Sequence, residues 1–465
     1  MLTRRSIGRS KPLAVAMLAA LGTAPMAAQA ATVTVNIINE AYGQGNSCSF
    51  FQAINTMSDG ATPGTLEGTC RSTVTGTFGN NDTILFDTTV FPYGGTNVIQ
   101  PFKSHVIKNA NLVIDATANG NVTLSGITSS SQTLVDLAPA GSSLTLKHMT
   151  MDKSYTRLHS TPTSHCYRQD SSGRTNYYGG AAICSVYANV TLIDSKVTNG
   201  ISQVGNTTGG GGGIFIAQGN ITLINTTISG NRTLGQGGGI SARFGNVTLI
   251  NSTVSDNRAH MGGGIAADGK VTLINSTVSG NQAGSSYRGG GISAGRIGVD
   301  MVNSTVSGNS AIAGAGIYAG GPVTLTNSTV SSNSAIDGSG IYMLQKFSPV
   351  TAKNSIIAGN LLSGGSQPGG DLLGNLSAGS YGNLIGVIPN LNLGPLADNG
   401  GPTQTMLPQT GSPAIDAISC ANAPPTDQRG MIRPDPGSTS ITPCDIGAVE
   451  VGSISDEIFK DGFGN

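Results

Sequence analysis

Residues 225–281 read NTTISGN at 225–231, NSTVSDN at 251–257 and NSTVSGN at 275–281, and a Gly-Gly-Gly-Ile tetrapeptide separates each copy from the next. The phrase returns at 303–309, 327–333 and 354–360. Its first asparagine recurs at intervals of 26, 24, 28, 24 and 27 residues. A repeat of this length, built of strand-like pieces, indicates a solenoid. This repeat therefore decides the fold class.

Each repeat contains three short strand-like pieces, such as VTLI at 247–250, TVS at 253–255 and a third that begins at Ile240. Because no piece has the 3.6-residue period of a helix, we expect an all-β, single-stranded parallel β-helix of about 10–12 coils, capped at both ends. Stacked amide side chains can hydrogen-bond along such a solenoid. The asparagines expected to form this ladder open each phrase: Asn225, Asn251, Asn275, Asn303, Asn327 and Asn354. The asparagine that ends each phrase is expected to mark the next bend.

Composition narrows the function classes. Charged residues make up 10% of the chain, aromatic residues 5%, and there is no tryptophan. This suits a thin, regular core of valine, leucine and isoleucine. A nucleic-acid-binding protein needs a clustered cationic surface, and the sequence has no basic run. We therefore expect no nucleic-acid partner.

The first 30 residues have the pattern of a secretory signal peptide. Four basic residues precede the apolar run Leu13–Leu21, and Ala28-Gln29-Ala30 resembles a cleavage site. Cleavage there would leave 20 basic and 24 acidic residues in a mature chain that begins at Ala31. No later apolar run reaches the length needed to span a membrane. We expect a secreted protein or one on the outer cell surface.

The six cysteines fall into three local pairs, which we expect to be disulfides: Cys48–Cys70, Cys166–Cys184 and Cys420–Cys444. Each pair lies where the repeat is absent or interrupted. No cysteine or histidine spacing is typical of a metal site. No cofactor is evident, and no ligand set supports Ca²⁺, although the sequence does not exclude it.

The interruptions of the repeat divide the chain. We expect a cap and first strands at 31–100, where residues 47–55 have a short helical pattern. Coils are expected at 101–390, with an insertion rich in His, Tyr and Arg at 155–178. A turn-rich module at 391–450, expected to cap the C-terminal end, precedes a tail at 451–465.

These features resemble known families. The repeats resemble the right-handed parallel β-helices of the pectate-lyase-like superfamily, and the alternation of GGGI with SGN is similar to polymorphic outer membrane proteins. The module at 391–450 resembles the choice-of-anchor Q domain through its DNGGPT, GSPAIDA, DQRG and CDIGAVE phrases. CSFFQAIN at 48–55 resembles a CSLREA segment, but Phe50-Phe51-Gln52 replaces Leu-Arg-Glu. The resemblance implies an exported β-helix and brings no catalytic residue.

Candidate catalytic residues are sparse. A glycosidase needs two carboxylates that flank one bond, and the outward acids Asp256, Asp268 and Asp300 occupy different repeat positions. A uronate polysaccharide lyase needs a base and a group that neutralises the substrate carboxylate. The residues of the insertion and its approach that suit these roles are Lys153, Tyr155, Arg157 and His159. The alternative is that the insertion is an ordered, solvated loop without a catalytic role.

Two sets of residues are candidates for ligand binding. Arg232 and Arg258 occupy equivalent positions in successive repeats, close to His260, and two stacked arginines suit an anion. The residue after each GGGI-type isoleucine forms an outward row, in which the aromatic members Phe215, Tyr318 and Tyr342 suit stacking on sugars. The alternative for the arginines is a solvated edge of the solenoid. The alternative for the aromatic residues is that they only fill the surface.

Our leading hypothesis from sequence is a binding or adhesion module for an extracellular polysaccharide or another cell-envelope component. A uronate polysaccharide lyase and a passive structural surface protein are the alternatives. The repeat itself is best interpreted as scaffold, because stacking requires its core, ladder and turns. Function is expected where the phrase breaks: at His148, in the insertion and in the loops after Asn231 and Asn257.

Overall fold

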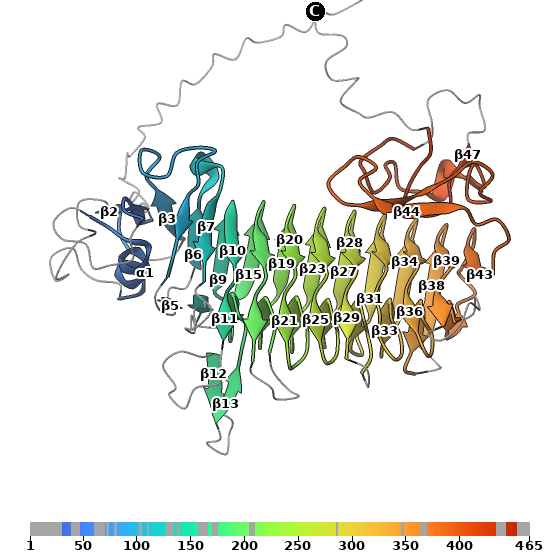
Figure 1. Ribbon diagram of the computed structural model, residues 1–465, viewed down its shortest axis with the longest axis horizontal. Coiled ribbons are helices and arrows are strands. Elements are labelled where there is room, and N and C mark those ends of the chain that lie inside the picture. The colour runs from blue at the N-terminus through green and yellow to red at the C-terminus, as the bar shows by residue number, and fades with distance from the viewer. Residues whose placement is uncertain are drawn as a thin grey trace, which may run out of the picture.

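The computed structural model spans residues 1–465 and describes 30–38, 47–59, 70, 74–78, 81–101, 105–108, 111–126, 134–136, 140–156, 166–169, 175–203, 210–284, 287–345, 348–362, 370–433 and 443–452. The described chain winds into a parallel β-solenoid of about nine turns (Figure 1). The expected coil number was slightly high because the strands nearest the two ends belong to incomplete turns. The described part holds no helix that is long and apolar enough to cross a membrane.

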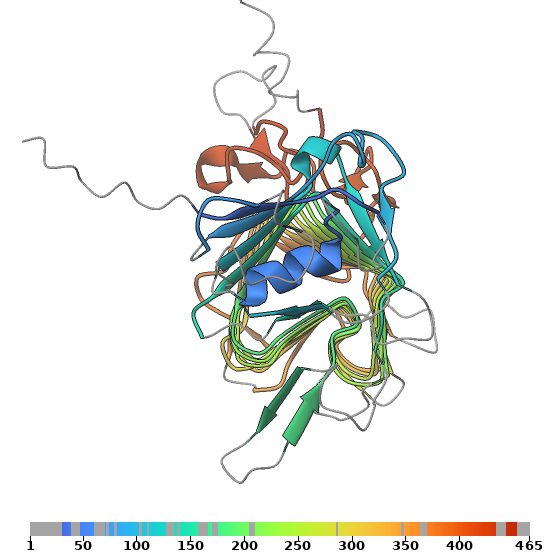
Figure 2. The ribbon, with the colours of Figure 1, turned by 90° about the vertical axis from the view of Figure 1, so that its left-hand side faces the viewer.

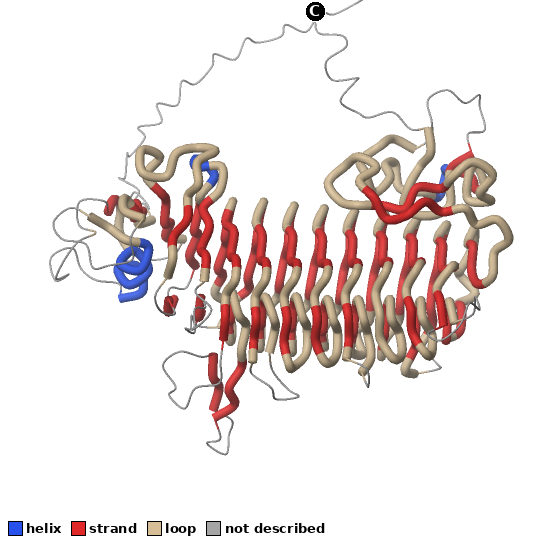
Figure 3. Tube along the Cα trace, in the orientation of Figure 1, coloured by secondary structure: helices blue, strands red, loops and turns tan. Residues whose placement is uncertain are grey.

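A regular turn contains four strands rather than the three expected (Figure 3). In residues 221–242 these are β19 (Ile221–Ile224), β20 (Thr227–Ser229), the two-residue strand β21 (Arg232–Thr233) and β22 (Ile240–Ala242). The additional strand is β21, which follows the second asparagine of the phrase. The four strands belong to sheets that we call I, II, III and IV in chain order.

Sheet I contains β2 (Val74–Thr75), β1 (Thr32–Val35), β3 (Asp82–Phe86), β6 (Asn111–Asp115), β9 (Ser143–Lys147), β15 (Asn189–Ile193), β19, β23 (Val247–Ile250), β27 (Val271–Ile274), β31 (Val299–Val302), β34 (Val323–Thr326), β38 (Pro349–Lys353) and β42 (Asn375–Leu376). Sheet II contains β4 (Val98–Ile99), β7 (Val122–Ser125), β10 (Met149–Asp152), β16 (Lys196–Thr198), β20, β24 (Thr253–Ser255), β28 (Thr277–Ser279), β32 (Thr305–Ser307), β35 (Thr329–Ser331), β39 (Ile356–Ala358) and β43 (Leu384–Gly386).

Sheet III contains β11 (Tyr155–Thr156), β17 (Ile201–Ser202), β21, β25 (Arg258–Ala259) and β29 (Gln282–Ala283), and bridges through Ser310 continue it to β36 (Ser334–Ala335) and β40 (Leu361–Leu362). Sheet IV contains β5 (His105–Ile107), β8 (Leu134–Asp136), β14 (Ile183–Ser185), β18 (Ile214–Ile216), β22, β26 (Ile265–Ala267), β30 (Ile292–Ala294), β33 (Ile317–Ala319), β37 (Ile341–Met343) and β41 (Leu372–Leu373). Outside these sheets lie β12 (Cys166–Gln169), β13 (Thr175–Tyr178), β44 (Leu393–Ala397), β45 (Thr405–Pro408), β46 (Ile418–Ser419), β47 (Pro443–Cys444) and two 3₁₀ turns at Thr117–Asn119 and Cys420–Asn422.

The core is a stack of identical aliphatic side chains. In β23, Val247 and Leu249 are buried, whereas Thr248 and Ile250 are half-buried on the outer face. The neighbouring strands pair in register, so that Val247 lies beside Val271 and Leu249 beside Leu273. Each turn therefore stacks its inward residues on those of the turns before and after it, and the inward residues of the sheets join in one core.

The asparagines that open each phrase are corner residues rather than the expected ladder. All six adopt left-handed backbone with φ between 44° and 51°, which asparagine tolerates better than most residues. Asn354 Nδ2 donates to Asn327 Oδ1 at 3.4 Å, but among the residues that the structure describes Nδ2 of Asn327 and Oδ1 of Asn303 have no hydrogen-bond partner. His148 occupies the same corner at φ 53°, as the repeat alignment predicted.

The buried amide ladder is formed instead by the asparagines that close each phrase. Asn257 Nδ2 donates to Asn281 Oδ1 at 3.0 Å and to the Ile228 carbonyl at 3.0 Å, while Asn257 Oδ1 accepts from the backbone N–H and Nδ2 of Asn231. The same pattern continues through Asn309, Asn333 and Asn360. The side chains of the residue after each opening asparagine make a parallel hydroxyl ladder, for example from the Ser252 N–H to Ser276 Oγ at 3.1 Å.

A short helix, α1 (Phe50–Asp59), covers the N-terminal end of the solenoid (Figure 2). Its start is a capping box, because the Ser49 N–H donates to Gln52 Oε1 at 2.9 Å and the Gln52 N–H donates to Ser49 Oγ at 3.3 Å. Phe50 and Ile54 are buried and join the solenoid core. The helical character expected within residues 47–55 is therefore confirmed from Phe50 onward, and the helix extends to Asp59.

The disulfides Cys48–Cys70 and Cys420–Cys444 are present as expected. Cys184 is also disulfide-bonded. The side chain of its expected partner, Cys166, lies outside the described part. The insertion begins later than expected, because Tyr155 and Thr156 form strand β11 of sheet III and pair with Ile201 and Ser202.

The module at 391–450 lies along the side of the solenoid rather than over its C-terminal end (Figure 1). Gln428 Nε2 donates to Thr277 Oγ1 at 2.8 Å, and Thr305 Oγ1 donates to Gln428 Oε1 at 2.6 Å. The Ala448 N–H donates to Thr329 Oγ1 at 3.1 Å. The outer face of sheet II is consequently buried in β28, β32 and β35 but only half-buried in β20 and β24.

A buried ion pair organises this module. Arg433 lies 2.7 Å from Glu450, and both side chains are almost fully buried. Arg433 also donates to the carbonyls of Asp445 at 3.1 Å and Gly447 at 2.9 Å. Burial raises the pKa of Glu450 to about 7, against the charge of Arg433 and the Asp445 N–H, which both lower it.

The raised pKa of Glu450 predicts a pH-dependent stability. Folding takes up a proton between the ordinary pKa of 4.5 and the folded pKa of about 7. The free energy of unfolding should therefore fall by about 1–3 kcal/mol as pH rises through this interval and stay level above it. Urea unfolding at several pH values measures this change, and Glu450→Gln should flatten it. A free energy of unfolding that rises over the interval would contradict the expectation.

Candidate functional site

A hollow on the outer face of sheet IV is the strongest candidate site. The outward side chains of successive strands lie in register, and the row consists of Cys184, Phe215, Ser241, Ala266, Ser293, Tyr318 and Tyr342. Its middle three members are small, whereas aromatic rings stand on both sides. The missing side-chain volume leaves a hollow of about 230 Å³ over Ala266 and Ser293.

Two sets of turns form the walls of this hollow. Gln236 and Met261 line the side of the glycine-rich turn that precedes sheet IV, and they are bridged to each other in parallel. Asp268 and Arg296 line the opposite side, in the turns that lead to sheet I. Gln345 lies at the end beyond Tyr318. A cleft with an apolar floor and a few polar groups has the usual make-up of a small-ligand site.

The aromatic end of the hollow is rigid. Tyr318 stacks on Tyr342 with ring centroids 5.3 Å apart and an interplanar angle of 26°. Arg288 donates to the Tyr318 hydroxyl at 2.8 Å, and its guanidinium lies 5.3 Å from the ring centroid of the same tyrosine. These contacts fix the Tyr318 ring at the edge of the floor. The more exposed ring of Tyr342 remains on the outer face.

One carboxyl group of the hollow has a perturbed pKa. Partial burial raises the pKa of Asp268, and the positive charge of Arg243 opposes this shift. Arg243 is held over Phe244, with its guanidinium 5.2 Å from the ring centroid. The Phe244 side chain is 59% exposed at the same set of turns. An acid, arginine side chains and exposed apolar surface therefore meet on one flank of the hollow.

The glycine triplets position sheet IV by allowing close stacking. A Cβ atom on Gly238 would lie 2.1 Å from the Gly263 carbonyl oxygen, and one on Gly263 would lie 2.4 Å from the Gly290 carbonyl oxygen. No other residue fits at such distances from the neighbouring backbone. The triplets are therefore structural turns, as the sequence indicated, and they leave the outward row free to vary.

The structure separates the three aromatic residues expected on this face. Tyr318 lines the hollow, and Tyr342 stacks on Tyr318 from the next strand. Phe215 is fully buried in a separate cluster with Cys184, Val186 and Ala217. The prediction that Phe215 could stack on a sugar is therefore wrong, because neighbouring side chains of the same face cover its ring.

Residues from the two other candidate sets meet at a second hollow of about 230 Å³ on sheet III, where Tyr155 and Arg232 lie on the same face. Lys153 sits at a left-handed corner with φ 54°, and its ammonium lies 3.5 Å from Asp152. His260 stacks on Tyr287 with ring centroids 4.8 Å apart and does not line either hollow. Arg157 and His159 lie outside the described residues.

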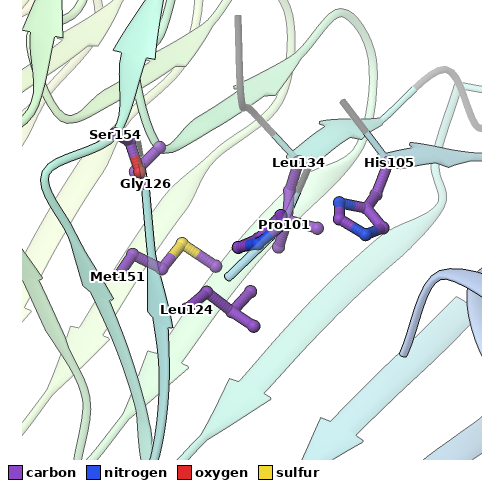
Figure 4. A pocket seen from close by; sticks show the side chains of 8 residues that line it. Pro101, His105, Leu124, Gly126, Leu134, Met151 and Ser154 are labelled. Carbon is purple, nitrogen blue, oxygen red and sulfur yellow. The ribbon is translucent and has the colours of Figure 1, made fainter. Parts of the chain in front are cut away.

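A third cavity lies inside the N-terminal turns (Figure 4). It measures about 20 Å³ and is lined mainly by apolar side chains such as Leu124, Leu134 and Met151, with His105 at one side. This volume suits at most one water molecule. Among the described residues, no three His, Cys, Asp or Glu side chains gather to hold a metal ion.

Sequence reasoning missed most of the polar residues of the sheet IV hollow. Arg288, Arg296 and Gln345 belong to turns whose lengths vary between repeats, so that alignment of the phrase did not bring them together. Asp268 was noted only as an isolated outward acid. The available signal was the presence of charged residues one or two positions after strands of sheet IV, such as Asp268 and Arg296.

Comparisons with known proteins support the fold. Residues 179–362 match the sequence model of the family described as "Right handed beta helix region". Among solved structures, the chain is similar to the crystal structure of pectate lyase Pel9A, with 13% identity, a TM-score of 0.44, and coverage of 91% of this chain and 97% of that chain. No curated protein sequence matches significantly. The matched residues lie within the parallel β-solenoid, so the description of this family agrees with a right-handed parallel β-helix fold.

Proposed function

We propose that the protein is an extracellular β-helix that binds polysaccharide in the hollow of sheet IV. The observation that carries this proposal is the row of outward side chains, in which small Ala266 and Ser293 adjoin the stacked rings of Tyr318 and Tyr342. Small residues leave room for a sugar ring, and the edge of the Tyr318 ring, which is held between Tyr342 and Arg288, borders this space.

The polar groups of the hollow suit a hydroxyl-rich ligand. Gln236 and Gln345 carry both donors and acceptors, Arg296 carries only donors, and the ionised Asp268 carboxylate only accepts. They lie around an apolar floor, which is how sugar sites combine hydrogen bonding with ring stacking. Because the floor crosses several strands in register, an extended chain can lie across successive turns.

We further propose that the protein acts outside the cytoplasm. Residues 1–30 have the pattern of a signal peptide, and the disulfides at Cys48–Cys70 and Cys420–Cys444 suit an oxidising compartment. The module at 391–450, which resembles a choice-of-anchor Q domain, would then lie at the cell envelope. Among the described residues of the module, the hydrogen bonds to the solenoid go to sheet II and the adjoining corner rather than to sheet IV.

A uronate polysaccharide lyase is the second candidate. It is favoured by the raised pKa of Asp268, which makes this carboxyl a stronger base, and by the adjacent positive charge of Arg243. Removal of a proton next to a carboxylate needs both a base and a cation that stabilises the developing negative charge. Asp268 and Arg243 would take the roles that we first assigned to the insertion.

One experiment separates these candidates. The mature chain is applied to an array of neutral and uronate-containing polysaccharides, and the uronate samples are followed by ultraviolet absorbance for unsaturated products. A binding module should retain a polysaccharide and generate no absorbance. Turnover that Asp268→Asn abolishes would establish the lyase instead. Failure to retain any polysaccharide, without turnover, would reject both functions.

A further inference from the structure

A second row of side chains, on the outer face of sheet III, forms a site separate from the sheet IV hollow. We call it the arginine row; its members, on five consecutive strands of the sheet, are Tyr155, Ile201, Arg232, Arg258 and Gln282. Parallel strands in register lie about 4.8 Å apart, so the row runs along the solenoid axis at this spacing.

The arginine row places like charges side by side. Arg232 and Arg258 are direct partners on neighbouring strands, and both side chains are exposed. Like charges directly opposite each other in a sheet are destabilising. Within the part of the chain that the structure describes, neither guanidinium has an ion pair or a hydrogen bond, so no protein group offsets this repulsion.

Two outward cations elsewhere in the solenoid pair with acids of neighbouring strands. Lys147 lies 3.0 Å from Asp115 on the neighbouring strand of sheet I, and Lys270 forms an ion pair with Asp300 in the next turn. In both cases a neighbouring strand carries an acid beside the cation. At the arginine row the neighbouring strand carries a second arginine instead. A bound anion would stabilise this pair of like charges.

A hollow adjoins the pair. Tyr155, Gln203 and Arg232 line a space of about 230 Å³ on this face, together with Ser202 and Thr233. The Tyr155 hydroxyl and the Gln203 amide are neutral donors beside the guanidinium. An oxyanion that accepts from Arg232 and Arg258 would thus have room for the sugar that carries it.

We propose that the arginine row binds the oxyanions, sulfate or carboxylate, of a linear anionic polysaccharide that lies along the solenoid axis. The guanidinium groups match such oxyanions by bidentate hydrogen bonding. Two arginines in a chain with equal numbers of basic and acidic residues form a local anion site rather than the broad cationic surface that nucleic acid requires. The site does not depend on the sheet IV hollow.

The test compares ligands that differ in charge. Dextran sulfate, polygalacturonate, neutral dextran and a short DNA duplex are titrated against the full chain at about 50 mM salt, where electrostatic binding is strong. One or both anionic polysaccharides should bind, and the stronger one identifies the oxyanion. Neutral dextran should not compete with either. Arg232→Gln/Arg258→Gln should weaken binding at least about tenfold and make its salt dependence shallower.

A matched variant controls for net charge. Lys147→Gln/Lys196→Gln removes two positive charges from sheets I and II and should leave the affinity within about twofold of the wild-type value. Because all four side chains are at least partly exposed, urea midpoints should confirm that both double variants fold. The proposal is overturned if neither polysaccharide binds, if DNA binds more tightly than both, or if the arginine and lysine variants weaken binding equally.

The outcome is independent of the sheet IV proposal. Ser293→Phe fills the sheet IV hollow and leaves the arginine row intact, so Arg232→Gln/Arg258→Gln should weaken the affinity for the anionic polysaccharide by the same factor in the Ser293→Phe variant as in the wild-type protein. If Ser293→Phe removes that binding while Arg232→Gln/Arg258→Gln leaves it unchanged, the anion site belongs to sheet IV and the arginine row does not bind.

Discussion

Replacing Asn257 with alanine should lower the free energy of unfolding by about 3–5 kcal/mol, because the substitution leaves several buried groups unpaired. Asn257 is 1% exposed and takes part in four side-chain hydrogen bonds, two as donor and two as acceptor. Its loss leaves the Ile228 carbonyl and both the backbone N–H and Nδ2 of Asn231 without these partners. Urea denaturation followed by circular dichroism measures the effect.

Asn251 in the same turn is the matched control. It has the same residue type and the same repeat period, but its side chain is half-buried and it adopts left-handed backbone with φ 50°. Asn251→Ala should cost only about 1 kcal/mol, from the strain of placing alanine in that conformation. Equal losses at the two positions would contradict the assignment of the ladder to the closing asparagines.

Replacing Arg433 with alanine should destabilise the lateral module by about 3–5 kcal/mol, because it leaves the buried Glu450 carboxylate without its cation. The carbonyl oxygens of Asp445 and Gly447 also lose a donor. As the module unfolds, the outer face of strands β28, β32 and β35 should become accessible. Limited proteolysis within 391–450 and urea unfolding report the change.

Two further variants separate the ion pair from ordinary surface charge. Arg433→Met/Glu450→Leu removes both buried charges and should recover much of the lost stability, because an apolar pair carries no desolvation cost. Arg296→Ala removes an exposed arginine and should change stability by less than about 0.5 kcal/mol. A double variant that is less stable than Arg433→Ala alone would show that the buried charges are not the cause.

The repeat made the fold predictable because its period sets the register. Once VTLI, TVS and GGI recur in order, equivalent residues must stack, and the core follows from the alternation of each strand. The same periodicity does not show which asparagine forms the ladder, because the opening and the closing asparagine of the phrase recur with the same period. Only backbone conformation distinguishes them: Asn251 turns the corner with positive φ, whereas Asn257 points its amide into the stack.

The position of the lateral module was not predictable from the sequence. It contacts Thr277, Thr305 and Thr329, which have the same repeat context as the uncovered Thr227 and Thr253. Nothing in the phrase marks which turns are covered. The choice depends on residues of the module such as Gln428 and Ala448, which lie 119 to 152 residues away from their partners in the chain.

The candidate site was predicted in part. Tyr318 and Tyr342 were expected on one outward row, and the structure places both there, with Tyr318 lining the hollow. The hollow itself exists because the row has small side chains at Ala266 and Ser293. These small residues indicate a hollow only once the neighbouring aromatic rings have been placed. The charged residues Asp268 and Arg296 lie in turns of unequal length, where the repeat gives no register.

The affinity of the Ser293→Phe variant for the polysaccharide selected on the array tests the central claim most directly. Phenylalanine at this position fills the hollow from its floor, whereas Thr227→Phe adds the same ring to the uncovered part of sheet II and serves as the control. We predict that Ser293→Phe lowers the affinity at least about tenfold and that Thr227→Phe leaves it within about twofold, with both variants folded. Wild-type affinity in a folded Ser293→Phe variant would contradict polysaccharide binding on sheet IV.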